Sequence, residues 1–201
     1  LRRIYHAFLM SDLPSFPEDT LLKLRQIVQE LGIQITQKEP KKEEGFPATF
    51  KGRELVLYKI GSPFEQVYTL VHVVGHMMQW CTPHPDLVHA NMLAYGPHQK
   101  LSSEDIQCVY TYEYEAARIG RRLLQDHVIV TPALDAMYTR FFFADFRYLI
   151  HFIETGLRGP SILGDFVRRE PYTSSLISPT TEPLRSLTDV TFRPEAYATV
   201  V

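Results

Sequence analysis

Residues 69–76 read Thr-Leu-Val-His-Val-Val-Gly-His, and they decide the interpretation of the chain. The run Ser-Pro-Phe-Glu at 62–65 stands just before them. It combines capping-box spacing with a proline in the first turn, so a helix is expected from there to about Trp80. Within that helix His72 and His76 lie about 40° apart, since each residue turns the chain by about 100°. Both imidazoles can therefore reach one metal ion, although two histidines at this spacing are a weak signal by themselves.

A second helix is predicted over about 102–125, and it carries two acids among small residues. Glu113 shares a side with the small residues, while Glu115 points about 160° away, so only one acid is expected to face the histidines. The small side chains, together with Gly75 on the first helix, allow close packing, and a carboxylate there would complete a three-ligand zinc site. The competing interpretation makes both acids surface residues paired with arginines of the same helix. The small residues are Ala116, Ala117 and Gly120, and the arginines are Arg118, Arg121 and Arg122.

Short elements are expected before the histidine helix. Residues 17–31 have an apolar stripe, a capping-box spacing at their start and a glycine after their end, which predicts a helix. Strands are expected at 33–36, 48–51 and 54–60, and the last two are predicted to form a hairpin. The charged stretch 38–45 between them is interpreted as a solvated turn.

The chain after the histidine helix is expected to be mostly helical. Three prolines and a glycine over 82–101 indicate a long loop with at most a short helical piece. A further helix, rich in phenylalanine, is expected over about 131–155. From Pro171 the composition shifts to Ser, Thr and Pro, which is typical of an extended tail. We therefore divide the chain into one domain, 1–170, and a C-terminal tail, 171–201.

Composition limits the classes of function. The chain has 201 residues and a net charge of -2, which argues against a large electrostatic surface for nucleic acid. No apolar run approaches the roughly 20 residues of a membrane span, and the start of the chain lacks the apolar core of a signal peptide. The two cysteines, Cys81 and Cys108, do not make a disulfide framework. A cytoplasmic protein with reduced thiols is expected, with no membrane partner and no direct contact to nucleic acid.

The two helical segments together resemble the ImmA/IrrE group of zinc metallopeptidases. In that group a segment of the form T-L-x-H-E-x-G-H is followed by E-x-x-A-N-x-F-A-x-x-L-L-x-P, and here the corresponding segments are 69–76 and 113–124. The resemblance covers about residues 17–132. It implies an α+β fold: a zincin-like metallopeptidase core with a small antiparallel sheet packed on helices, and a mostly helical C-terminal half.

The same resemblance implies a zinc site and a defect in it. The implied ligands are His72, His76 and Glu113, with Glu115 in reserve. Val73 stands where the group has the glutamate that takes a proton from the zinc-bound water. Valine cannot accept a proton, and a positioned acid–base group typically contributes about 10²–10⁴ in rate. Losing the glutamate removes no ligand, so the metal could remain, or the site could be empty.

Three functions are compatible with this sequence. The first is a catalytically impaired metallopeptidase-like protein that holds a protein or peptide in the old substrate cleft and has a regulatory role. Because members of the group cleave transcriptional repressors in stress responses, the resemblance implies a repressor-like transcription regulator as partner. The second is an active zinc-dependent endopeptidase with a displaced general base, and the third is a structural module without a site. The displaced bases considered are Glu65, His84, His89 and His98.

Overall fold

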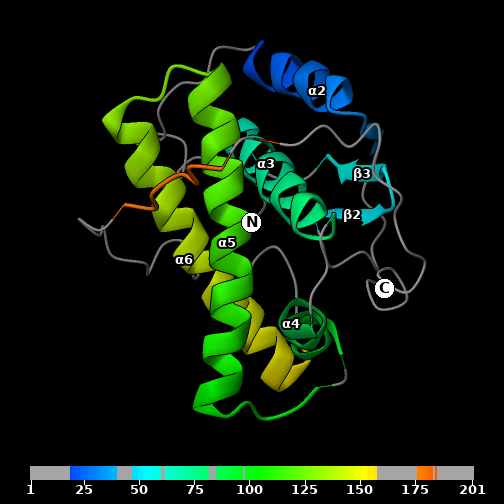
Figure 1. Ribbon diagram of the computed structural model, residues 1–201, viewed down its shortest axis with the longest axis vertical. Helices are drawn as coiled ribbons and strands as arrows, with labels where there is room; N and C mark the ends of the chain where they lie inside the picture. The colour runs from blue at the N-terminus through cyan, green and yellow to red at the C-terminus, as the bar shows by residue number, and fades with distance from the viewer. Residues whose placement is uncertain are drawn as a thin grey trace, which may run out of the picture.

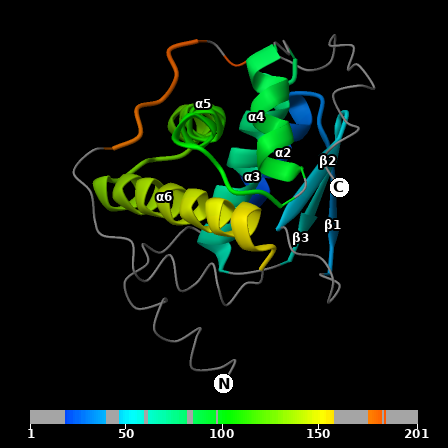
Figure 2. The ribbon, with the colours of Figure 1, turned by 90° about the horizontal axis from the view of Figure 1, so that it is seen from below.

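The computed structural model describes residues 19–39, 47–59, 62–81, 85–96, 98–157, 176–182 and 184. Within these residues a three-stranded sheet forms one layer, and the helices lie to one side of it (Figures 1 and 2). The expected α+β class is confirmed. The helices are α2 (Thr20–Glu30), α3 (Pro63–Gln79), α4 (Pro85–Tyr95), α5 (Ser103–His127) and α6 (Pro132–Thr155). The strands are β1 (Gln34–Lys38), β2 (Ala48–Lys51) and β3 (Glu54–Tyr58).

The sheet is mixed, and the expectation of a purely antiparallel sheet is wrong. The strand order is β1-β3-β2. β2 and β3 form the predicted antiparallel hairpin, and its turn contains Gly52 at a φ of 61°, a conformation that favours glycine. β1 runs parallel to β3, with Gln34 opposite Glu54. Parallel and antiparallel strands share the same side-chain period of two, so the local pattern carried no information about this direction.

Helix α3 lies at the centre of the fold and begins as its sequence predicts. Ser62 accepts a hydrogen bond from the Glu65 backbone at 3.3 Å, and the Glu65 carboxylate accepts one from the Ser62 backbone in return. The helix is buried on most sides because it packs against α2, α5 and β2. Its apolar positions, including Leu70 and Met77, are part of the largest hydrophobic cluster. No described helix is long and apolar enough to cross a membrane, and neither Cys81 nor Cys108 forms a disulfide bond with a described residue.

Helices α3 and α5 approach each other closely at two glycines. A Cβ atom on Gly75 would lie 2.1 Å from the backbone oxygen of Ala116, and one on Gly120 would lie 2.7 Å from the backbone oxygen of Val71. Real Cβ atoms do not come so near to backbone atoms, so each position requires glycine for steric reasons. The close packing expected from the small residues of α5 is therefore present.

Helix α4 contradicts the expectation of a long loop over 82–101. The prolines of this stretch mark the limits of a helix and do not interrupt it. Pro85 occupies the start of α4, where proline is well tolerated, and Gly96 follows its last residue. The helix packs against α5 through one buried side. Its buried residues are Leu87, Ala90, Asn91, Leu93 and Ala94.

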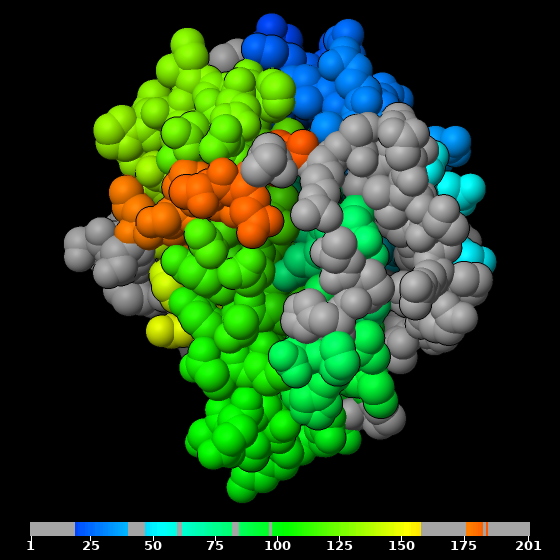
Figure 3. Space-filling view, viewed as in Figure 1, coloured from blue at the N-terminus to red at the C-terminus, as the bar shows by residue number. Residues whose placement is uncertain are grey.

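Residues 176–182 and 184 form an extended segment that packs against the helical half. Figure 3 shows this segment in orange across α5. Ile177 is 2% exposed and belongs to the main hydrophobic cluster, and its N–H donates to Thr139 Oγ1 at 3.1 Å. The N–H of Thr180 donates to the backbone oxygen of Arg118 at 3.2 Å. The rest of the predicted tail, 171–175, 183 and 185–201, lies outside the described residues, as does the predicted start of the first helix at 15–18.

Candidate metal centre

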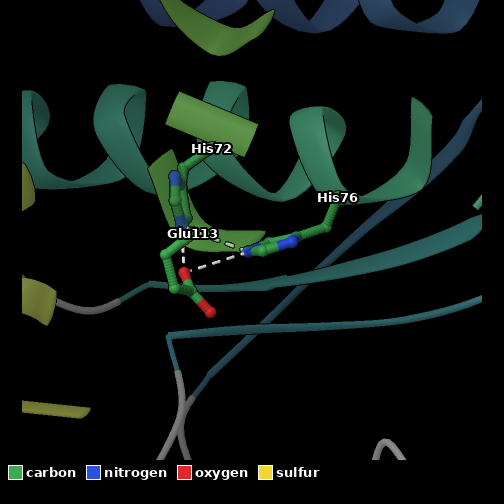
Figure 4. Close-up of side chains that lie close together, drawn as sticks. All are labelled: His72, His76 and Glu113. Atoms are coloured by element: carbon green, nitrogen blue, oxygen red, sulfur yellow. Dashed lines mark hydrogen bonds and ion pairs between the residues drawn. The ribbon is translucent and has the colours of Figure 1, made fainter. Parts of the chain in front are cut away.

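Three buried side chains from two helices converge on one point (Figure 4). His72 and His76 come from α3, and Glu113 comes from α5. Glu113 Oε2 lies 3.0 Å from His72 Nε2 and 3.2 Å from His76 Nε2, and the two Nε2 atoms are 3.2 Å apart. The three residues are 6%, 3% and 5% exposed. These are the residues that the resemblance implied as metal ligands.

The triangle of donor atoms has the dimensions of a metal site. Tetrahedral sites built from imidazole and carboxylate have metal–ligand bonds of about 2.0–2.2 Å, which separates the ligand atoms by about 3.3–3.6 Å. The three observed separations of 3.0–3.2 Å are slightly shorter. One ion placed just outside the plane of the three atoms would reach bonding distance to each with small side-chain adjustments. The cluster could therefore hold a metal ion.

Gln79 orients the ring of His76 toward the point where the three donor atoms converge. Its amide nitrogen donates to the backbone oxygen of Tyr112 at 2.8 Å, which directs its amide oxygen toward His76 Nδ1 at 3.0 Å. An amide oxygen only accepts, so Nδ1 carries a proton, and Nε2 is the atom that faces the other two donors. Ligand histidines in metal proteins are oriented in this way by a partner on the other ring nitrogen. A proton on Nε2 or a bound cation would complete the contact of Nε2 with Glu113 Oε2.

Two further polar atoms of the cluster are buried without a partner among the described residues, His72 Nδ1 and Glu113 Oε1. A buried polar atom without a partner typically costs about 1–3 kcal/mol of stability. Aromatic rings enclose the same residues. Tyr68 stacks on His72 with ring centroids 5.3 Å apart, and the Tyr112 ring lies 4.5 Å from that of His76. These rings keep water away from the donors, which strengthens their attraction for a cation.

Glu113 is ionised at neutral pH despite its burial. Burial alone would raise its pKa, but the adjacent His76 and His72 outweigh this effect and lower the pKa to about 2. Metals bind the deprotonated form of a carboxylate. The side chain is thus already in the form that a metal requires.

Glu115 lies on the opposite side of α5, as its angular position predicted. Its side chain is 49% exposed, and its Oε1 accepts a hydrogen bond from Arg118 Nη1 at 3.2 Å. The competing interpretation of paired surface acids therefore applies to Glu115 and is wrong for Glu113. Glu115 does not reach the histidines, and its reserve role as a ligand has no support in the structure.

No displaced base is found among the described residues that the sequence singled out. Val73 is half-buried and packs against the main hydrophobic cluster. Glu65 is held by Ser62 in the helix cap. His89 and His98 are exposed and do not belong to the cluster of metal-ligating groups. His84 lies outside the described residues.

Sequence reasoning missed one acid beside the centre, Asp145 on α6. Its Oδ2 accepts a hydrogen bond from the hydroxyl of Tyr68 at 3.4 Å, and Tyr68 is the residue that stacks on His72. Burial raises the pKa of Asp145 to about 6; His72 and Tyr68 oppose the rise, and the charge of Glu113 adds to it. A signal was present in the sequence, because Asp145 follows Phe141 by four residues and so continues the buried aromatic side of α6.

Three donors from α3 and α5 therefore supply the geometry and the chemistry of a candidate metal site. Two imidazole nitrogens and one carboxylate form a set that transition metals bind, and hard oxygen-seeking ions do not prefer it. The extra acid on α6 places a second carboxylate near the same point without joining the cluster. No protein-family model, no curated protein and no solved structure matches this chain.

Proposed function

We propose that this chain is a zinc-binding, metallopeptidase-like protein of the ImmA/IrrE kind whose catalytic power is impaired. The observation that carries the proposal is the triangle of His72 Nε2, His76 Nε2 and Glu113 Oε2, with sides of 3.0–3.2 Å. Two imidazoles and one carboxylate are the ligands of many catalytic zinc sites, which leave a fourth position open. The zincin-like core, which rests on the sequence resemblance, and the cytoplasmic location, which rests on the composition, both belong to this proposal.

Impaired catalysis follows from the residue after His72. Bound zinc would supply a Lewis acid that polarises a carbonyl and lowers the pKa of a bound water. Val73 offers no atom that could take the proton released during attack. A missing acid–base group typically costs about 10²–10⁴ in rate, so a complete metal site here retains binding and loses most of its turnover.

The function that remains is recognition of a protein or peptide. A metal held there with one open position would bind the carbonyl or carboxylate oxygen of a segment that reaches it. Gln79 and the rings of Tyr68 and Tyr112 hold the ligand histidines in place for this task. We therefore propose a regulatory, peptide-binding role, with a repressor-like transcription regulator as the partner that the resemblance implies.

Asp145 favours a second candidate, an active hydrolase with a displaced base. Its pKa of about 6 makes it mostly ionised at neutral pH and still able to take a proton. Its hydrogen bond to Tyr68 places it near His72, on the helix facing α3. In this alternative Asp145 takes over the role that the glutamate has in related enzymes.

Three proteins separate the two candidates: the wild type, Val73→Glu and Asp145→Asn. We expect the zinc-loaded wild type to cut a labelled casein substrate no faster than the background rate. Val73→Glu should gain hydrolysis that a chelator abolishes, since it restores the missing base. Robust chelator-sensitive hydrolysis by the wild type that Asp145→Asn removes would contradict impairment and support the second candidate. A wild type that binds no zinc would contradict both.

A further inference from the structure

A pocket of about 410 Å³ lies between α2 and β1 and shares no residue with the metal centre. It has a mixed lining, with one cationic side chain, three amides and two apolar residues. Figure 2 shows α2 and β1 as parts of the same side of the molecule. A pocket of this size accommodates a small organic molecule. The lining residues are Leu22, Arg25, Gln26, Gln29, Ile35 and Gln37.

The guanidinium group of Arg25 is incompletely satisfied within the described part of the chain. Its Nε and Nη2 atoms are both buried and neither has a hydrogen-bond partner. These two nitrogens are neighbours on one edge of the planar group, and their N–H bonds point the same way. This is an edge that binds a carboxylate through two parallel hydrogen bonds. Buried charged donors without acceptors are costly, and the described residues provide no anion for this edge.

The surroundings of Arg25 select the kind of anion. Arg25 is the single charged residue among the described residues that line the pocket, so one negative charge balances the site. A phosphate dianion would normally recruit a second cation or the N–H groups of a helix start, and Arg25 lies in the middle of α2. Leu22 is 68% exposed, and together with Ile35 it offers an apolar surface for a carbon chain.

Two long, exposed side chains line the pocket beside Arg25. Gln26 and Gln29 are exposed residues on the same helix as Arg25, and their long side chains have several rotamers. Burial also lowers the pKa of Arg25, because the guanidinium has lost part of its hydration. A bound carboxylate would supply a counter-charge.

We propose that this pocket binds a small organic monocarboxylate. The carboxylate pairs with the Nε–Nη2 edge of Arg25, and the carbon chain lies against Leu22 and Ile35. This site is independent of the metal centre, and it gives the chain a second ligand besides the proposed zinc.

The test follows the Arg25 Nε–H resonance by NMR in the full chain, with butyrate as the probe. We expect a saturable shift with butyrate, and no saturable shift with butyramide, the neutral analogue, or with inorganic phosphate at equal ionic strength. Arg25→Lys keeps the charge and loses the two-bond edge, so butyrate affinity, read from backbone amides around the pocket, should fall by about tenfold or more. Arg122→Lys, on a different helix, is the matched control and should bind butyrate as the wild type does.

A second measurement separates a ligand site from a structural arginine. Arg25→Met, without butyrate, should unfold in urea at the wild-type midpoint or above it, because the two unsatisfied donors are removed together. A clearly lower midpoint would show that Arg25 stabilises the fold and would overturn the proposal. A response to butyramide or phosphate equal to that for butyrate, or an unchanged butyrate affinity in Arg25→Lys, would also overturn it.

Discussion

Each of the two sides of α5 carries a glutamate, but one glutamate is buried and the other is half-exposed. On the inner side Glu113 is 5% exposed and faces two imidazoles. On the outer side Glu115 is half-exposed and pairs with Arg118, and Arg122 pairs with Asp126 at 2.7 Å. The outer acids have permanent positive partners from the same helix, whereas the inner acid has partners whose charge depends on protonation or on a bound ion.

This difference indicates which of the two carboxylates can act as a metal ligand. Exposed pairs such as Glu115–Arg118 are typically worth about 0–1 kcal/mol, and either member can be lost at little cost. A buried carboxylate without a permanent counter-charge is expensive, and it persists where a cation completes it. The inner side of α5 is therefore expected to respond strongly to substitution and to metal, and the outer side weakly.

The largest expected effect concerns the contact that brings the inner side of α5 to α3. Gly75→Ala should destabilise the fold by about 3 kcal/mol or more, at the upper end of the cost of overpacking. The clash is between the new Cβ atom and a backbone oxygen, and neither can move away without a shift of a helix backbone. The new Cβ atom would meet the Ala116 oxygen at 2.1 Å. Urea unfolding measures the change. Arg122→Ala, on the outer side, should stay within about 0.5 kcal/mol of the wild type. Equal stability of the two variants would contradict the close helix contact.

Metal removal should give the next largest effect. At a free zinc concentration 100 times the Kd, a single site stabilises the folded state by about 2.7 kcal/mol. Thermal unfolding with zinc and with a chelator measures this difference. His72→Ala should abolish the response to zinc, while Glu115→Gln should retain it. A chelator effect of equal size in His72→Ala would show that zinc acts elsewhere.

The third prediction concerns the amide that orients His76. Gln79→Leu removes the acceptor for Nδ1–H and should weaken zinc binding by about 10–100-fold, the usual range for such partners. The acceptor distance of 3.0 Å and the buried ring make this contact specific. Competition with a chromophoric chelator measures the affinity. Gln107→Leu, at an exposed position of α5, is the control, and an unchanged affinity in Gln79→Leu would contradict the proton assigned to His76 Nδ1.

The fourth and smallest effect is a pH dependence caused by Asp145. Its pKa in the folded protein is about 6, above the usual 3.8, so folding favours the protonated form. That stabilisation is present at low pH and is lost as the pH rises from about 4 through 6. Asp145→Asn should flatten this decline and gain about 1–3 kcal/mol relative to the wild type between pH 4 and pH 7. Urea unfolding across this range measures the slope, with Asp126→Asn as control. A wild-type slope in Asp145→Asn would contradict the raised pKa.

Local signals in the sequence were sufficient for the elements that carry the donors. The capping box of Ser62 and Glu65 predicted the start of α3, and the angular separation of Glu113 from Glu115 predicted that one acid alone would face the histidines. These features depend on residues within one or two helical turns of each other. The small residues of α5 likewise predicted its close contact with α3.

The features that were missed depend on contacts between distant parts of the chain. The parallel direction of β1 is a property of tertiary packing, and five residues of alternating pattern do not encode it. Helix α4 was missed because its prolines were interpreted as breaks, although proline is compatible with a first turn. Asp145 meets Tyr68 across 77 residues of sequence, and only the packing of α6 on α3 brings them together.

The most direct test of the central claim is the zinc content of three purified proteins, measured by elemental analysis after gentle dialysis. Glu113→Gln and Glu115→Gln make the same chemical change two residues apart, on the two sides of α5. We expect one zinc ion per chain in the wild type and in Glu115→Gln, and almost none in Glu113→Gln. Equal zinc content in the two variants, or none in the wild type, would contradict a metal centre at His72, His76 and Glu113.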